Sequence, residues 1–136
     1  PPRTVPAAEK TGWTGVGSHD IITGTDLRKR DIQEKVAQEI EKNDPDILIG
    51  SPPCTAYSIL NEKFNYKKMD PETVRDKRKE GRIHMEFACE RYRDQMRRGK
   101  YFVHEHPASA SSWSESCVKD LICQYIIKQI KIILKA

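Results

Sequence analysis

The sequence lacks several features that would assign it directly to a membrane, secreted or zinc-binding class of protein. No apolar run approaches the roughly 20 residues of a membrane-spanning helix, and the longest apolar-rich stretch, residues 121–134, is interrupted by Lys128 and Lys131. No secretory signal is visible. The four cysteines form no Cys-x-x-Cys pair, so neither a zinc ribbon nor a thioredoxin-like motif is supported. We therefore expect an intracellular protein of a reducing compartment, without a transmembrane segment.

The length and composition indicate a globular chain. With 136 residues, one domain is expected, and a core of useful size can be buried. Hydrophobic residues make up 37% and charged residues 32%, which is polar but does not require long disorder. The chain does not begin with methionine, so its start is either processed or cut from a longer chain.

Positive charge is concentrated in the middle of the chain. The net charge is only +4, but residues 65–100 carry 12 basic and 7 acidic side chains. This excess favours a nucleic-acid partner for that segment. The alternative is an ordinary solvated helix face. The expected nucleic-acid-binding residues are Arg75, Arg78, Arg82, Arg93 and Arg97.

Helices and strands are predicted to alternate after an irregular, proline-containing arm at residues 1–12. Alternation of this kind predicts an α/β fold in which residues 13–136 form one domain, a small Rossmann-like parallel sheet with helices on both faces. In chain order, the expected elements are an extended piece at 16–22, a helix opened by a capping box at Asp31 and Glu34, a strand at 46–50, a polar loop at 61–70, a helix at 71–98, a strand at 100–104, and a helix capped by Ser112 and Glu115.

Cys54 and Glu105 each follow a predicted strand. In parallel sheets, ligand sites gather at the carboxyl edge, and one crossover connects these two strands. We therefore expect the thiol and the carboxylate to face one crevice. Cys54, held in a Pro-Pro-Cys turn, is a candidate nucleophile, or alternatively a small buried residue at a strand end.

The histidines of His104-Glu105-His106 are candidate metal ligands. Two imidazoles at alternate positions of a strand share one side. No third and fourth ligands occur at metal-site spacing, so we expect no metal. A zinc deaminase would need Pro-Cys-x-x-Cys after the histidine motif, but Pro53-Cys54 precedes it and lacks the second cysteine.

The pairing of Gly50-Ser51-Pro52-Pro53-Cys54 with Glu105-His106-Pro107 resembles the cytosine-5 DNA methyltransferase family. The resemblance implies that Cys54 adds to carbon 6 of a flipped cytosine while Glu105 bonds ring nitrogen 3. It also implies S-adenosylmethionine as cofactor, with Asp20, Asp26 and Pro52 as candidate contacts. Short motifs between His84 and Trp113 are similar to a retroelement-encoded relative of this fold.

The chain departs from the family pattern in several places. Thr55 replaces the usual glutamine and His106 the usual asparagine, and the family's target-recognition region is absent. The motif Trp13-x-Gly15-x-Gly17 is similar in sequence to the family's glycine-rich cofactor loop, but no apolar strand precedes it. We therefore expect a degenerate methyltransferase-like domain, a structural or nucleic-acid-contacting subunit of a larger assembly. The alternative is an active methyltransferase fragment.

Overall fold

The computed structural model describes residues 4–126 and falls into two compact units, Pro1–Pro45 and Asp46–Ala136. Each unit is described by itself. The division differs from the sequence analysis, which placed its boundary after residue 12 and extended one domain to residue 136; residues 127–136 lie outside the described part. Within residues 4–126, no helix combines the length and the apolar character that a membrane crossing requires.

The first unit contains two helices and one short turn. The helix α1, Thr4–Glu9, occupies part of the expected irregular arm, so that expectation is wrong for these residues. Where an extended piece was expected, the chain forms a 3-10 turn at Ile21–Thr23. Asp20 caps this turn because its carboxylate accepts the Ile22 backbone N–H at 2.8 Å. An aspartate that satisfies an amide in this way favours a turn over a strand.

The helix α2, Arg30–Asn43, confirms the helix predicted there but begins differently. Its N-cap is Lys29, which makes no side-chain cap bond, so the predicted capping box is wrong. Asp31 lies instead in the first turn, where a negative charge favours the helix dipole. Val36 is the buried residue of its inner face.

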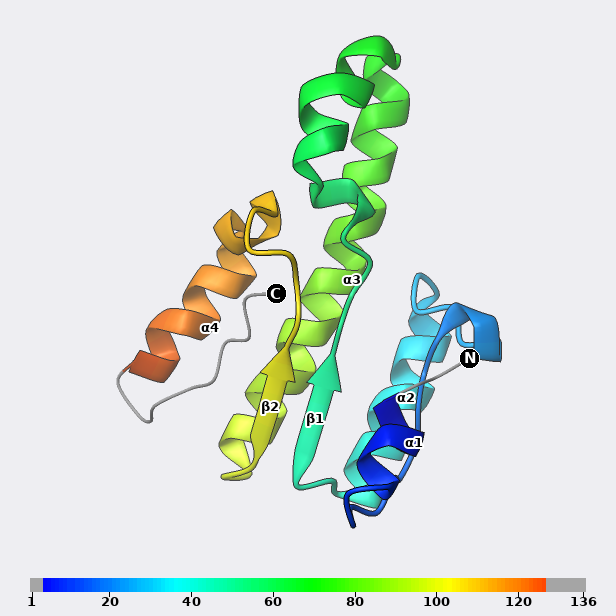
Figure 1. The fold of residues 1–136 in the computed structure, drawn as a ribbon, viewed down its shortest axis with the longest axis vertical. Helices are drawn as coiled ribbons and strands as arrows, with labels where there is room; N and C mark the ends of the chain where they lie inside the picture. Colours follow the sequence, from blue (N-terminus) through cyan, green and yellow to red (C-terminus); the bar gives the residue numbers. More distant parts are fainter. Residues whose placement is uncertain (1–3, 127–136) are drawn as a thin grey trace. The chain divides into compact units, whose positions relative to one another are not determined.

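The second unit is built on a strand–helix–strand crossover (Figure 1). Strand β1, Ile47–Gly50, runs parallel to strand β2, Tyr101–His104, with Gly50 paired to His104. The helix α3, Pro71–Arg97, connects them. The α/β class is therefore confirmed in its coarse form. The described residues contain two strands rather than the three expected.

The ends of α3 match the sequence signals. Asp70 caps the helix and accepts the Thr73 backbone N–H at 2.9 Å, and Pro71 occupies the first turn. Gly99 has φ +70°, the left-handed conformation that glycine adopts readily after a helix. Both predicted ends of this helix are confirmed.

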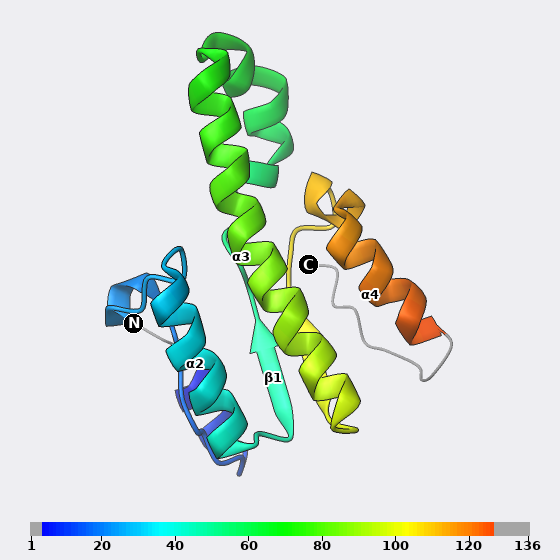
Figure 2. The same cartoon turned by 180° about the vertical axis from the view of Figure 1, so that it is seen from behind.

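The buried cluster of the second unit joins α3 to the Thr55–Tyr57 turn, to Ala110 and to the helix that follows it, and Leu48 and Phe102 of the sheet pack against this cluster. Figure 2 shows α3 lying across the sheet on this side. Tyr92 of α3 stacks on Phe102 of β2 with ring centroids 4.3 Å apart. Its hydroxyl also lies where a side chain at Gly50 would be, so only glycine fits at this point of β1. Met85 and Cys89, four positions apart, are fully buried and belong to an apolar stripe on the core face of α3.

The opposite face of the sheet differs from the prediction. Ile49 and Tyr101, which alternate with the residues packed on α3, are 51% and 63% exposed. Within the second unit, α3 covers one face, so the expected helices on both faces are not found there.

Two segments flank α3. Residues 61–70, expected as a polar loop, contain a π-helical turn at Asn61–Asn65 and a 3-10 turn at Tyr66–Lys68. At the other side of the core, the helix α4, Ser116–Ile126, packs on α3. Ser112 does not cap α4 as expected but lies in a preceding 3-10 turn, Ser111–Ser114, with its hydroxyl bonded to His106.

Candidate functional site

The carboxyl ends of β1 and β2 lie side by side and carry the segments that contain Cys54 and Glu105 (Figure 1). The Glu105 backbone N–H donates to the Gly50 carbonyl at 3.0 Å and so extends the hydrogen bonding between β1 and β2 by one residue beyond His104. The structure thus brings the two predicted segments to one sheet edge.

The direct partner of Glu105 is Ser51. The Ser51 hydroxyl donates to Glu105 Oε2 at 2.6 Å. Among the described contacts, Glu105 is bonded to Ser51 and Gly50, and none joins it to Cys54. Sequence reasoning missed Ser51 as a site residue. Its position directly after the strand was the available signal, because the parallel register places it beside the residue that follows His104.

Cys54 is half-buried and begins a short turn, Thr55–Tyr57. Its carbonyl accepts the Tyr57 backbone N–H at 3.0 Å. Ala56 and Tyr57 are buried against α3, and a Cβ at Gly81 would lie 2.6 Å from the Ala56 Cβ. Tight packing behind the turn therefore fixes the position of the Cys54 backbone.

A buried histidine ties the Pro-Pro-Cys loop to the second strand end. His106 Nε2 lies 2.8 Å from the Pro52 carbonyl, and Nδ1 lies 2.6 Å from the Ser112 hydroxyl. A carbonyl only accepts, so Nε2 carries the proton and Nδ1 accepts from Ser112. Burial lowers the pKa of His106, which favours this neutral form. His106 therefore holds the loop in place.

The neighbouring histidine, His104, is hydrogen-bonded to a buried tyrosine of α3. His104 Nδ1 lies 3.0 Å from the Tyr92 hydroxyl, and its ring stacks on His106 with centroids 5.4 Å apart, so the two rings share one side as predicted. Burial, followed by the nearby His106, lowers the pKa of His104 to about 4. Within residues 4–126, no three His, Cys, Asp or Glu side chains form a metal-binding group.

The residues expected to contact S-adenosylmethionine each have a partner within the protein. Asp20 caps its own turn, and Arg28 bonds both carboxylate oxygens of Asp26 at 2.8 and 3.0 Å. The hydrogen bond from Arg28 lowers the pKa of Asp26 to about 2. The Pro52 carbonyl faces His106, and both aspartates belong to the other unit. We assign no step to this cofactor.

All five predicted nucleic-acid-binding arginines make contacts within the protein, and two of them, Arg93 and Arg97, lie in the second half of α3. Arg93 donates to the Cys117 carbonyl at 3.3 Å and so joins α3 to α4. Arg97 pairs with Asp94 at 2.6 Å. At 1.5 Å per residue, Arg93 lies about 16 Å along α3 from Arg82, so the five residues do not form one cluster.

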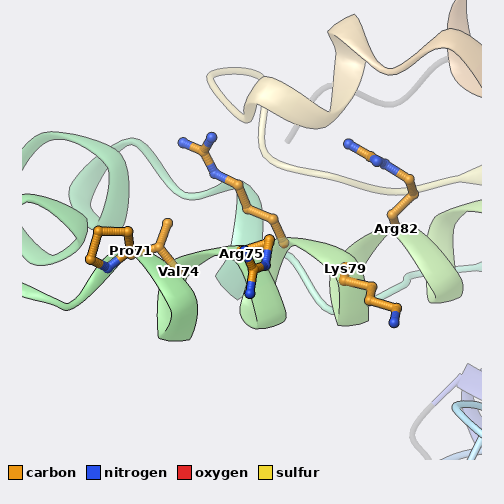
Figure 3. Close-up of a pocket in the computed structure, with 6 residues that line it drawn as sticks. Pro71, Val74, Arg75, Lys79 and Arg82 are labelled. Atoms are coloured by element: carbon orange, nitrogen blue, oxygen red, sulfur yellow. The ribbon is translucent and has the colours of Figure 1, made fainter.

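The other three arginines share a surface groove of about 410 Å³ on the first half of α3 (Figure 3). We refer to it as the α3 groove. At about 100° per residue, Arg75, Arg78 and Arg82 fall within about 60° of one another, whereas Asp76 and Glu80 lie on the opposite side of the helix. The groove is therefore cationic. Its lining residues are Pro71, Val74, Arg75, Arg78, Lys79 and Arg82.

The contacts of these cations are of the weak, exposed kind. Arg75 pairs with Glu72 at 3.3 Å, and Arg82 pairs with Glu115 at 3.5 Å. The Arg78 guanidinium lies over the Tyr66 ring, 5.6 Å from its centroid. Exposed ion pairs contribute little to stability, so these side chains can exchange their partners for an anionic ligand at low cost.

Scans against protein-family models, curated proteins and solved structures found no match to this chain.

Proposed function

We propose that the chain is a methyltransferase-like α/β domain that contacts nucleic acid through the α3 groove and does not itself transfer methyl groups. In this proposal it serves as a subunit of a larger assembly. The observation that carries the proposal is the gathering of four cationic side chains, Arg75, Arg78, Lys79 and Arg82, on one face of α3.

The spacing of these cations suits a phosphate backbone. From Arg75 to Arg82, the helix rises about 10 Å, whereas the charges of one DNA strand follow one another about every 3.4 Å along the duplex axis. A backbone lying along the helix can therefore offer several phosphates to the groove. Such contacts carry no sequence information, so we expect binding with little sequence preference.

A matched pair of lysines on α3 tests the proposal. Lys79 lines the groove, whereas Lys77 lies about 160° away around the helix. Lys79→Gln and Lys77→Gln remove the same charge from neighbouring exposed positions. We expect Lys79→Gln to weaken the binding of a fluorescently labelled DNA duplex by about threefold or more at moderate salt, and Lys77→Gln to change it little. Equal losses in both variants would contradict a specific groove.

The second candidate is an active cytosine-5 methyltransferase that uses Cys54. It is favoured by the neighbouring positions of the Cys54 loop and Glu105 at one edge of the sheet. In the resemblance, the Cys54 thiolate adds to carbon 6 of cytosine while Glu105, as the carboxylic acid, donates its proton to ring nitrogen 3. The first step needs a deprotonated Cys54, and the second needs a protonated Glu105 released from Ser51.

Methyl transfer distinguishes the two candidates. The assay measures tritiated methyl incorporation into cytosine-containing DNA and RNA, with Cys54→Ser as the control. We expect no incorporation above background by the chain alone, because the two expected cofactor carboxylates, Asp20 and Asp26, are already bonded to neighbouring residues of their own unit. Incorporation by the native chain that disappears in Cys54→Ser would establish the enzyme and overturn the non-catalytic proposal.

A further inference from the structure

Two cysteines that lie 28 positions apart in the sequence meet between α3 and α4. Cys89 is 1% exposed in the core face of α3, and Cys117 is half-buried in the first turn of α4. Cys117 packs against the buried cluster that contains Cys89, and the two thiols lie close enough to interact. Arg93, one turn after Cys89, bonds the Cys117 carbonyl at 3.3 Å and holds the two helices at this point.

We propose that Cys117 is a peroxide-reactive cysteine and that Cys89 resolves its oxidised form into a disulfide that joins α3 to α4. This proposal is independent of nucleic-acid binding and of methyl transfer.

Three features make Cys117 the first thiol to react. It is the more exposed member of the pair, so an oxidant reaches it first. It lies in the first turn of α4, and the positive end of a helix dipole stabilises a thiolate. The interaction with the Cys89 thiol also lowers the pKa of Cys117, assisted by the charge of Arg93 and opposed by burial and by Glu115 and Glu86.

Cys89 has the opposite character. The interaction with the Cys117 thiol, together with burial, raises its pKa, so it stays a protonated thiol. A buried thiol beside a more accessible one with a lowered pKa is the arrangement of a resolving cysteine.

The reaction balances with hydrogen peroxide as the oxidant. The Cys117 thiolate attacks one peroxide oxygen, the O–O bond breaks, and hydroxide leaves and takes a proton as water; Cys117 is then a sulfenic acid. The Cys89 sulfur attacks the Cys117 sulfur, the S–O bond breaks, and the departing hydroxyl takes the Cys89 proton as a second water. Two thiols lose two electrons and two protons, and one peroxide becomes two waters.

The tryptic map of the full chain makes the test direct. Cys89 lies in peptide 83–91, Cys117 in 101–119, Cys123 in 120–128 and Cys54 in 43–63. The purified chain is treated with hydrogen peroxide, its remaining thiols are blocked with iodoacetamide, and the digest is analysed by mass spectrometry. We expect peptides 83–91 and 101–119 to be joined, in a protein that stays monomeric on a non-reducing gel, and the link to be reversed by dithiothreitol.

Variants identify the order of the two steps. In Cys89→Ala, the Cys117 sulfenic acid has no resolving thiol, so we expect it to accumulate and to be captured by dimedone. Cys123→Ser is the matched control on α4 and should keep the link. The proposal is overturned if the treated wild-type chain shows no joined peptide, if Cys54 or Cys123 is oxidised before Cys117, or if the link forms only between two copies. The wild-type measurement decides even if a variant fails to fold.

Discussion

Acid should unfold the second unit through His104. The folded protein holds this imidazole neutral because burial, with the nearby His106, lowers its pKa from 6.5 to about 4. An unfolded chain takes up the proton as the pH falls through 6.5, whereas the folded chain does so only near pH 4. Stability is therefore complete above pH 6.5 and is lost as the pH falls toward 4. The pKa difference corresponds to about 3 kcal/mol, with a slope of at most about 1.4 kcal/mol per pH unit.

His104→Phe isolates this contribution. Phenylalanine keeps a ring against Tyr92 and Trp113 but takes up no proton, and it costs the variant about 1 kcal/mol at pH 7 through the lost Tyr92 bond. Because carboxylates and His106 titrate in both proteins, the difference between the two pH profiles belongs to His104. Urea unfolding followed by circular dichroism from pH 7.5 to 4 measures it.

We expect the free energy of unfolding of the wild type to fall more steeply with acid than that of His104→Phe, so that the two curves converge or cross. Parallel profiles for the wild type and His104→Phe would refute the reasoning.

Three further substitutions test the packing that positions the site. Gly50→Ala should cost about 1–3 kcal/mol of unfolding free energy because its methyl group meets the Tyr92 ring, whereas Gly17→Ala should change it by less than about 0.5 kcal/mol. Ser112→Ala should cost about 1–3 kcal/mol because His106 Nδ1 loses its donor while buried. Asp70→Ala should cost about 1 kcal/mol through the lost cap of α3. Urea titration checks each one, and a neutral Gly50→Ala or Ser112→Ala would contradict the described packing.

The predictable parts of the fold were those with local signals. The apolar run before Ser51, Pro71 at a helix start and Gly99 after a helix end each act over a few residues, and the corresponding elements are confirmed. The helical turns within 61–68 were missed because they depend on packing, as when the buried Tyr66 hydroxyl reaches the Ala56 carbonyl at 3.0 Å. The capping box at Asp31 is wrong because the helix begins two residues earlier, with Lys29 at the N-cap.

The order and direction of the strands allowed the general location of the site to be predicted, but not its side-chain contacts. One crossover between two strands places the Cys54 loop and Glu105 at the same edge, and the structure has them there. The bond between Ser51 and Glu105 depends on the register of the two strands, which no local pattern specifies. Likewise, the apolar stripe of α3 included Cys89, but its contact with Cys117 follows only from the packing of α4.

The salt dependence of nucleic-acid binding tests the central claim most directly. Counterion release makes the logarithm of affinity fall with the logarithm of salt by about 0.9 for each duplex phosphate contacted. We expect a labelled duplex to bind the wild-type chain with a clear salt slope, and we expect the Arg75→Gln, Arg78→Gln, Arg82→Gln triple variant, checked for folding by circular dichroism, to reduce that slope by up to about 2.7. An affinity that ignores salt, or a folded triple variant with the wild-type slope, would contradict a nucleic-acid contact at the α3 groove.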